Sequence, residues 1–472
     1  GQLEVQVADA FDAPDNVPVN PATYTAEYGI PVVHLGVSPV IDTDVYTPVS
    51  IVYRGRVFEG AQAKYRGATS LDYPKRSYTL EFAKTDRFAD PLSVAGFTGK
   101  RKLTLTTTFD DNSYLRARLA FRLWNEISAE SVQVESFSVV VFVDGVYQGV
   151  YTLTDHIDRH LMEDNDFFED GNLYKARTHN ANFRLTTLEG EAKPLLSLGF
   201  EKTEGTPLDG EPGAYADLED LIVWLASSSR DTFLAGVDAR VARAEYEAWW
   251  MLVGYIAAAD SAGKNSYHYR DPRFGTPDAR FHCVPWDFND SFGQSWRSTR
   301  RAVDSVLPAS LTRLNLIFER LLTEPETREP LLERFRALLD GPWSAPAIIE
   351  TIDAWEGEIR DVARRDERRW GAAYADYFSE RTDLTSFEQE VDYVRNWVVA
   401  RHDFIRNVHL QRPLIINPPG PPDDPGSPGS SGSPDAQGSP DAQGSPDEKG
   451  SPDGVGSPDK APAMAHPATN AH

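Results

Sequence analysis

The sequence contains a single cysteine, Cys283, among 472 residues. One cysteine forms no intramolecular disulfide and cannot build a cysteine-rich zinc module. Long apolar runs are missing as well. No stretch of about 18 apolar residues occurs, so the sequence predicts no transmembrane helix and no insertion into a membrane. We expect Cys283 to be a small buried apolar residue of the strand that leads to Asp287.

Basic residues are in the minority. The chain has 47 Lys and Arg against 72 Asp and Glu, which gives a net charge of −25. This balance argues against binding of nucleic acid or of an anionic membrane surface through bulk electrostatics. A protein substrate, possibly a basic one, suits the chain better.

The two ends of the sequence differ from its middle. The chain opens with "GQLEV", without a methionine or a charged leader region. We therefore expect that a leader was removed and that the protein is secreted or associated with the cell envelope. Residues 411–472 consist mainly of Gly, Ser, Pro and Asp and repeat GSPD every six residues. This tail has almost no large apolar residue to bury, so we expect it to be disordered, either as a tether or partner-binding segment or as a solubilising end.

The first part of the chain is mostly extended in pattern. Asp144-Gly145 predicts a tight hairpin turn, because this pair tolerates positive φ angles. One helix is expected at 115–127, with Asp111 to Ser113 as N-cap candidates. The β-branched and aromatic segments predict strands at 30–37, 49–58, 61–67, 76–82, 102–109, 136–145 and 146–154.

The pattern becomes helical after residue 210. Only 265–288 is extended there. Ten Trp, 19 Tyr and 23 Phe supply a large core, so we predict a monomeric α+β fold with two lobes around a cleft. Helical spacing of apolar residues occurs at 215–229, 242–259, 311–323, 329–340, 345–370 and 386–410. The predicted parts are an N-terminal extension at 1–24, a β-rich lobe at 25–160, a helical lobe at 161–410 and the disordered tail at 411–472.

Three polar residues border the extended region 265–288. Asp260 and Asn265 are five positions apart, at the end of an apolar helix and the start of a strand, and Asp287 follows the next strand. In phosphoryl transfer one carboxylate orients the attacking hydroxyl, while an amide and a second carboxylate hold Mg²⁺ against the phosphates. The order Asp, Asn, Asp supplies these three groups.

The segment "KYRGATSLDYPKRSYTLEF", residues 64–82, predicts a strand, a loop rich in glycine and hydroxyl groups, and a second strand. Such a loop brings backbone N–H groups close to phosphate, and Lys75 at the second strand could pair with it. The alternative is a surface hairpin with a solvated Lys75–Arg76 pair.

These residues make the chain resemble the CotH-type (spore coat protein H) atypical protein kinases over roughly residues 25–410. The motifs that carry the resemblance occur in the family's order: "YRGATS…PKRSYTLEF", "DDNSYLRARLAFRLWNEI", "VFVDGVYQGVYTLTDHID", "GNLYKA", "AADSAGKNSYHYRD" and "PWDFNDSFG". The resemblance implies a divergent, two-lobed protein-kinase-like fold that binds ATP with Mg²⁺ or Mn²⁺. The implied activity is phosphorylation of Ser or Thr in proteins.

The resemblance also implies roles for individual residues. Asp260 is similar to the family's catalytic aspartate, and Asn265 and Asp287 to its metal-holding residues. Lys75 resembles the catalytic, phosphate-pairing lysine, with Arg76 as the alternative. The remaining implied nucleotide contacts are Arg66, Gly67 and Ser70 in the loop and Thr154, Asp155 and Ile157 at the hinge near adenine.

The chain departs from ordinary kinases at several points. Ala258-Ala259 replaces His-Arg before Asp260, Asn289 replaces the glycine two positions after Asp287, and no GxGxxG loop is present. No helix acid is an obvious partner for Lys75. A cell-surface adhesion or scaffold module with little or no catalysis, or a transferase that moves AMP, therefore stays as an alternative to the kinase.

Other polar clusters have simpler interpretations. His156 and His160, with Glu163 nearby, have a spacing that would allow zinc but lack the HExxH pattern, so a polar segment between lobes is the preferred interpretation. The arginines of 360–370 alternate with acids and predict a salt-bridged helix face. We expect Trp249-Trp250 to lie in the core.

Overall fold

The computed structural model describes residues 18–37, 41–90, 97–128, 131–273, 275–276 and 279–411. Most of the predicted N-terminal extension and all of the tail after residue 411 lie outside these residues. The lobe boundaries at 24, 160 and 410 stay predictions.

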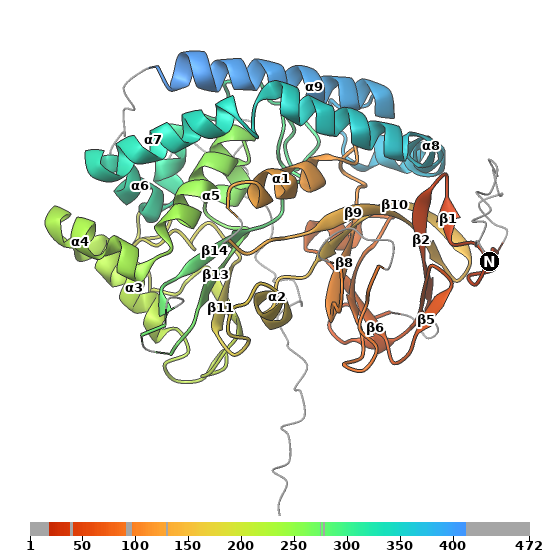
Figure 1. The fold of residues 1–472 in the computed structure, drawn as a ribbon, viewed down its shortest axis with the longest axis horizontal. Helices are drawn as coiled ribbons and strands as arrows, with labels where there is room; N and C mark the ends of the chain where they lie inside the picture. Colours follow the sequence, from red (N-terminus) through yellow and green to blue (C-terminus); the bar gives the residue numbers. More distant parts are fainter. Residues whose placement is uncertain are drawn as a thin grey trace, which may run out of the picture.

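A curled ten-stranded sheet forms one side of the molecule (Figure 1). Its order is β3-β6-β7-β8-β10-β9-β2-β4-β5, with β1 paired to β2, and only the β2–β9 pair is parallel among the described pairs of this sheet. The strands are β1 (Ala26–Glu27), β2 (Ile30–Gly36), β3 (Thr47–Pro48), β4 (Ser50–Tyr53), β5 (Arg56–Phe58), β6 (Gln62–Arg66), β7 (Ser77–Glu81), β8 (Lys102–Thr107), β9 (Ser136–Val143) and β10 (Val146–Asp155). All predicted strands of this region are confirmed, and the Arg54-Gly55 turn splits 49–58 into β4 and β5.

Both faces of this sheet are buried. On β9, Val139 and Val141 belong to the core that the curled sheet encloses, whereas Val140 and Phe142 belong to the larger core under the helices. Successive strand residues point to opposite faces, so a strand between two cores is apolar at nearly every position. This explains the continuous run "FSVVVFV" in the sequence.

Helix α1 (Arg116–Asn125) interrupts the strands as predicted, but its N-terminus differs from the prediction. The residue before it is Leu115, which provides no side-chain cap. Asp111 instead reaches forward, and its Oδ2 accepts the N–H of Arg116 at 3.0 Å. Asp111 therefore accepts a hydrogen bond from the first turn of the helix although it does not occupy the N-cap position.

A second, four-stranded sheet has the order β12-β11-β13-β14. Its strands are β11 (Asn172–Ala176), β12 (Phe200–Glu204), β13 (Ser266–Arg270) and β14 (His282–Pro285), and the short helix α2 (Arg159–Asp164) precedes β11. The pair β13–β14 confirms the extended region predicted near Asp287. Strands β11 and β12 were not predicted, because each is a five-residue segment without a distinctive apolar pattern.

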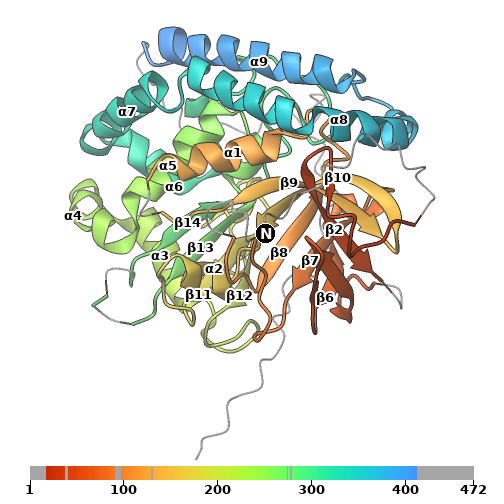
Figure 2. The same cartoon turned by 45° about the vertical axis from the view of Figure 1, so that its right-hand side comes forward.

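The helical part begins after the second sheet. The helices are α3 (Ala216–Ser227), α4 (Arg230–Arg240), α5 (Arg243–Tyr255), α6 (Leu316–Thr323), α7 (Pro325–Asp340), α8 (Ala345–Tyr377) and α9 (Phe387–Phe404). In Figures 1 and 2, α8 and α9 lie across the top of the molecule, and α8 extends over the curled sheet. The indole N–H of Trp370 donates to the carbonyl of Gln148 on β10 at 2.8 Å. Helix α8 thus joins the C-terminal part to the first sheet.

Several predictions about single side chains are confirmed. Trp249, Trp250 and Cys283 are buried in the core. The arginine-rich segment forms part of α8 with ion pairs at its surface, such as Arg360 to Glu356 at 3.0 Å and Arg364 to Glu388 at 2.5 Å. The predicted α+β class is confirmed.

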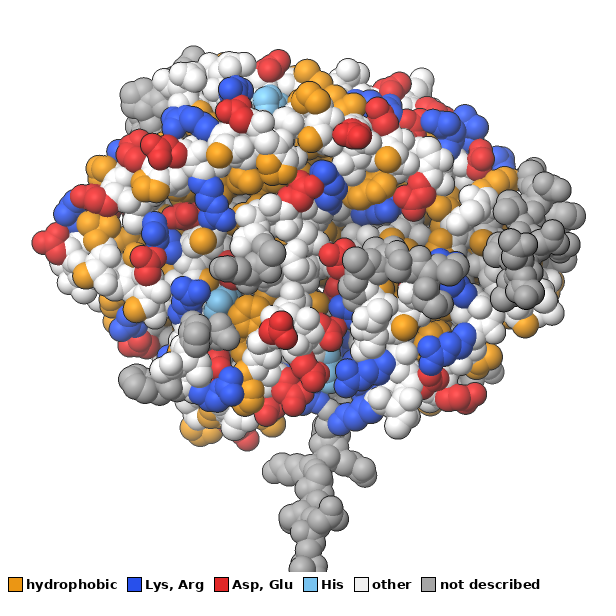
Figure 3. Space-filling view, viewed as in Figure 1, with side chains coloured by type: hydrophobic (Ala, Val, Ile, Leu, Met, Phe, Trp, Pro, Cys, Tyr) orange, Lys and Arg blue, Asp and Glu red, His pale blue; other side chains and the backbone are white. Residues whose placement is uncertain are grey.

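The surface is of mixed charge on the face seen in Figure 3, where acidic and basic side chains lie next to one another. Within the described part of the chain, no helix is both long enough and apolar enough to cross a membrane.

Candidate functional site

Two neighbouring loops carry the three polar residues that the sequence singled out. Asp260 lies in the turn between α5 and β13, and Asn265 ends that turn. Asp287 follows β14, the antiparallel partner of β13. The amide Nδ2 of Asn265 donates to Asp260 Oδ2 at 3.0 Å. We call Asp260, Asn265 and Asp287 the aspartate site.

Backbone and hydroxyl contacts hold the two loops together. The N–H of Trp286 donates to the carbonyl of Asn265 at 2.8 Å. The hydroxyl of Ser261 donates to the carbonyl of Asp287 at 2.9 Å. Because of these bonds, Asp287 cannot move independently of the loop that carries Asp260.

The same loops contain backbone in the left-handed region. Ala257, Asn265, Asp287 and Phe292 have φ angles of 60°, 55°, 63° and 46°. Each such conformation is unfavourable for a residue with a side chain, and conformations of this kind concentrate at ligand sites. The left-handed backbone of Asn265 and Asp287 therefore costs conformational free energy, and it sets the direction of the two side chains.

Asp260 lies among hydrogen-bond donors. His179 Nε2 is 3.3 Å from Asp260 Oδ1, and Lys264 Nζ is 3.3 Å from Asp260 Oδ2. Burial raises the pKa of Asp260, but the His179 hydrogen bond and the charge of Lys264 outweigh burial and bring the pKa down to about 2. Asp260 is therefore ionised at neutral pH and a weak base.

Asp287 has the opposite character. Its side chain is exposed to solvent, yet desolvation by the surrounding protein and the charge of Asp260 raise its pKa. Arg66, Lys264 and Lys175 lower the pKa without cancelling that rise. The guanidinium of Arg66 lies 5.5 Å from the ring centre of Trp286, so this basic residue of β6 faces the loop that carries Asp287. A cation near Asp287 would lower this raised pKa, because it favours the ionised carboxylate.

Asp110 is a further acid beside this loop. Asn289 Nδ2 donates to Asp110 Oδ2 at 2.7 Å, and the hydroxyl of Tyr73 lies 3.3 Å from the same oxygen. Burial raises the pKa of Asp110 to about 6, against the effect of the Asn289 hydrogen bond, and the charge of Asp287 adds to the rise. Asn289 thus connects the Asp287 loop to Asp110.

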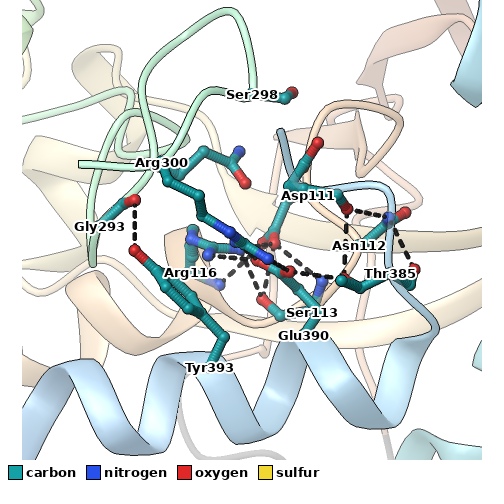
Figure 4. Close-up of polar contacts among 12 residues, drawn as sticks. Asp111, Asn112, Ser113, Arg116, Gly293, Ser298, Arg300, Thr385, Glu390 and Tyr393 are labelled. Carbon is teal, nitrogen blue, oxygen red and sulfur yellow. Dashed lines mark hydrogen bonds and ion pairs between the residues drawn. The ribbon is translucent and has the colours of Figure 1, made fainter. Parts of the chain in front are cut away.

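A network of ion pairs lies next to the segment that follows Asp287 (Figure 4). Arg116 is fully buried and contacts Asp111 Oδ1 at 2.5 Å and Glu390 Oε1 at 2.6 Å. Arg300 contacts the same Glu390 oxygen at 2.5 Å. Burial raises the pKa of Glu390, but these two arginines outweigh burial and bring it to about 2. The network joins α1, α9 and the segment that follows Asp287.

Lys75 is not brought to the aspartate site. It is fully buried, and Nζ donates to Asp366 Oδ2 of α8 and to the carbonyl of Val150, both at 2.6 Å, with Thr108 Oγ1 at 3.5 Å. Asp366 also accepts the N–H of Val150 at 2.6 Å. The acid that pairs with Lys75 is therefore an aspartate 291 residues away, which the sequence did not mark as a partner.

The loop between β6 and β7 holds the other predicted phosphate contacts. Gly67 has a φ of 127°, and a Cβ there would lie 1.9 Å from Ser70 Oγ, so glycine is required at this position. Arg66 Nη1 donates to Thr106 Oγ1 at 3.4 Å. Arg76 lies over the ring of Tyr65, at 5.8 Å from its centre. Of these residues, Arg66 is the one that affects the pKa of Asp287.

The predicted hinge residues lie at the end of β10 and just after it, and Thr154 and Asp155 have partners of their own. The carbonyl of Thr154 accepts the hydroxyl of Thr104 at 3.3 Å, Asp155 is 3.1 Å from Lys100, and Ile157 is buried. None of these partners belongs to the aspartate site. Their contact with adenine stays a prediction.

The aspartate site suits Mg²⁺ better than a metal held by protein alone. Among the described residues, no group of three or more His, Cys, Asp or Glu side chains is arranged to hold a metal ion, and this includes His156 and His160. Asp287 and Asn265 together offer one exposed carboxylate and one amide oxygen. Mg²⁺ keeps several waters and uses one or two carboxylates together with substrate phosphates, so this donor set fits.

Some residues around the site were not predicted. Lys264 stands next to Asn265 and four residues after Asp260, a spacing that could have pointed to it. His179, Asp110 and Asp366 come from distant segments, and no local pattern marks them.

The fold and the site define an α+β protein in which two interlocked loops bring two aspartates and an asparagine together. Residues 63–405 match the sequence profile of the family described as CotH kinase protein, so the chain belongs to that family. It is also similar to the inner spore coat protein H of Bacillus subtilis (strain 168), with 24% identity over 344 residues that cover 73% of this chain and 85% of the relative.

Proposed function

We propose that the protein is an atypical protein Ser/Thr kinase with a two-lobed, kinase-like arrangement, which transfers the γ-phosphate of ATP to a protein substrate. The observation that carries the proposal is the hydrogen bond between Asn265 and Asp260 in a loop interlocked with the loop of Asp287. The family's description as a kinase supports it.

Asp260 orients the acceptor hydroxyl. With a pKa of about 2, it is too weak a base to remove the proton before transfer begins, but its carboxylate can accept a hydrogen bond from Ser or Thr. His179 and Lys264 hold the carboxylate in place. Lys264 also contributes positive charge where the phosphoryl group would pass.

Asn265 and Asp287 are the residues that would hold Mg²⁺ or Mn²⁺, which would neutralise phosphate charge. The raised pKa of Asp287 supports this role, because a nearby cation favours its ionised form. Arg66, together with the N–H groups of the loop that starts at Gly67, is placed to contact phosphate. Lys75 holds the same loop to α8 through Asp366 and acts as a positioning residue.

The relative's name supports a place for the protein outside the cytosol, in a coat or on a cell surface. The net charge of −25 favours a basic protein substrate. The location outside the cytosol and the basic substrate are both proposals, and identification of the acceptor protein would test them.

The deciding experiment incubates the purified chain with a basic acceptor protein and either γ-labelled or α-labelled ATP. Label transferred only from γ-labelled ATP supports the kinase. Label transferred only from α-labelled ATP would indicate an AMP transferase. No transfer from either, with Mg²⁺ or Mn²⁺ present, would favour the scaffold alternative.

A further inference from the structure

A cavity of about 320 Å³ lies apart from the aspartate site. We call it the α8 cavity. Its walls are α8, the segment 108–114 that leads into α1, and the segment 384–386 that leads into α9. The volume is within the range of pockets that bind small ligands or single side chains. Asp260, Asn265 and Asp287 do not line it.

Aromatic rings and two carboxylates give the α8 cavity its chemistry. Phe109, Trp370 and Tyr374 form the aromatic walls, and Asp366 and Glu367 are the acids. Aromatic faces together with a carboxylate attract organic cations. Nearby, the chain's own Arg369 already rests 4.9 Å from the ring centre of Trp370, so this indole accommodates a guanidinium.

Asp366 and Glu367 differ in whether a basic side chain forms an ion pair with them. Asp366 is neutralised by Lys75 at 2.6 Å. Within the described part of the chain, Glu367 has no ion pair and accepts a backbone N–H from Phe387. Arg364, whose charge lowers the pKa of Glu367, is itself 2.5 Å from Glu388. Of the two acids that line the cavity, Glu367 is therefore the one without an ion-pair partner among the described residues.

A glycine keeps this space open. Gly371 lies inside the 33-residue helix α8 and lines the cavity, although glycine is the least favourable helix residue apart from proline. A Cβ added at Gly371 would meet no atom closer than Glu367 Cγ at 3.9 Å. Any larger side chain there would occupy space beside Glu367.

We propose that the α8 cavity binds an arginine or lysine side chain of a basic polypeptide, with Glu367 as the counter-ion and Trp370 as the aromatic wall. Charge complementarity selects this occupant, because the chain has a net charge of −25 and the cavity an unmatched acid. The exposed side chain of Leu384 at the rim offers an apolar contact to a neighbouring residue of the peptide. The inference rests on the proposed function only in treating this polypeptide as the phosphate acceptor.

The test measures binding of a fluorescent nona-arginine peptide by anisotropy, without ATP and at about 150 mM salt, where bulk attraction between exposed charges is screened. Gly371→Leu should fill the cavity and weaken binding at least about tenfold. Gly357→Leu is the matched control, because Gly357 is an exposed glycine of the same helix with no atom within 4 Å of an added Cβ, and it should change the affinity less than about twofold. Circular dichroism and melting curves confirm that both variants fold.

A second pair of variants tests the charge. Glu367→Gln should weaken binding about three- to tenfold, while Glu350→Gln, an exposed acid of the same helix, should not. Equal affinity of the parent, Gly371→Leu and Glu367→Gln would mean bulk electrostatic attraction only and would overturn the inference.

The binding assay separates this inference from the proposed function. If no phosphate is transferred but Gly371→Leu abolishes peptide binding, the cavity assignment stands and the kinase proposal fails. If transfer occurs and Gly371→Leu leaves binding unchanged, the reverse holds.

Discussion

The ion network of Figure 4 and the neighbouring aspartate site differ in how their buried charges are compensated. In the network of Figure 4, Arg116 and Arg300 face Asp111 and Glu390, so two positive charges meet two negative ones. Around the aspartate site the acids instead act on one another. Desolvation and then the charge of Asp260 raise the pKa of Asp287, and desolvation and then the charges of Asp111 and Asp287 raise that of Asp110.

This difference distinguishes charges that stabilise the fold from charges that could bind a ligand. A buried charge that is fully paired fixes the position of the elements that carry it, and removing one partner leaves an uncompensated ion. Carboxylates whose pKa values are raised by one another and by desolvation mark a place where a bound cation would improve the energy. The four predictions below test this contrast, from the largest expected effect to the smallest.

The network should fail when one partner is removed. Glu390→Gln leaves Arg116 and Arg300 with one carboxylate, Asp111, and should lower the free energy of unfolding by about 3–5 kcal/mol. Urea unfolding would measure the loss. The control is Asp392→Asn on the same helix, which removes an exposed pair with Arg395 and should cost less than about 1 kcal/mol. Equal effects of the two variants would remove the contrast.

Asp110, which lies beside the loop of Asp287, should make stability fall as the pH rises. The pKa of Asp110 is about 6 in the folded protein, against an ordinary value of 3.8. The folded state therefore holds more protons than the unfolded state between these values, and the stability that depends on them is present below about pH 4 and lost as the pH passes 6. The loss is up to about 3 kcal/mol.

Asp110→Asn should remove that part of the pH dependence. The free energy of unfolding of parent and variant, measured from pH 4 to pH 7, should diverge in favour of the variant as the pH rises. Parallel curves would show that Asp110 titrates as it does in the unfolded chain.

The two aspartates of the site should separate by role. Asp260→Asn should leave ATP binding within about threefold, worth roughly 0.7 kcal/mol, and reduce phosphate transfer by on the order of 10² or more. Asp287→Asn should reduce both metal-dependent ATP binding and transfer. It should leave stability equal or higher, because the variant lacks the charge that Asp260 opposes. Unchanged transfer by both variants would reject the assignment of catalysis to the aspartate site.

The smallest effect is expected for removal of the C-terminal tail. A chain that ends at residue 414 lacks residues 415–472, which contain little apolar area to bury. We expect its melting temperature to stay within about two degrees of the parent's. A larger drop, measured by calorimetry, would mean that the tail docks on the body of the protein.

The sequence predicted those features that depend on local pattern. The strands of the curled sheet, helix α1 and the order Asp260, Asn265, Asp287 follow from periodicity, turn residues and spacing within short segments. His179 and Asp366 could not be predicted, because they reach their partners Asp260 and Lys75 across 81 and 291 residues. Strands β11 and β12 are too short to have a pattern of their own; β11 pairs with β13, and β12 pairs with β11.

The pair between Lys75 and Asp366 also has a consequence for the order in which the chain can mature on the ribosome. At about 5–20 residues per second, the 291 residues between them take roughly 15–60 s to synthesise. During that interval Lys75 and the backbone of Val150 lack the acid that satisfies both in the finished protein. The loop that starts at Gly67 therefore gains its contact with α8 only when α8 has emerged, late in the synthesis of the chain.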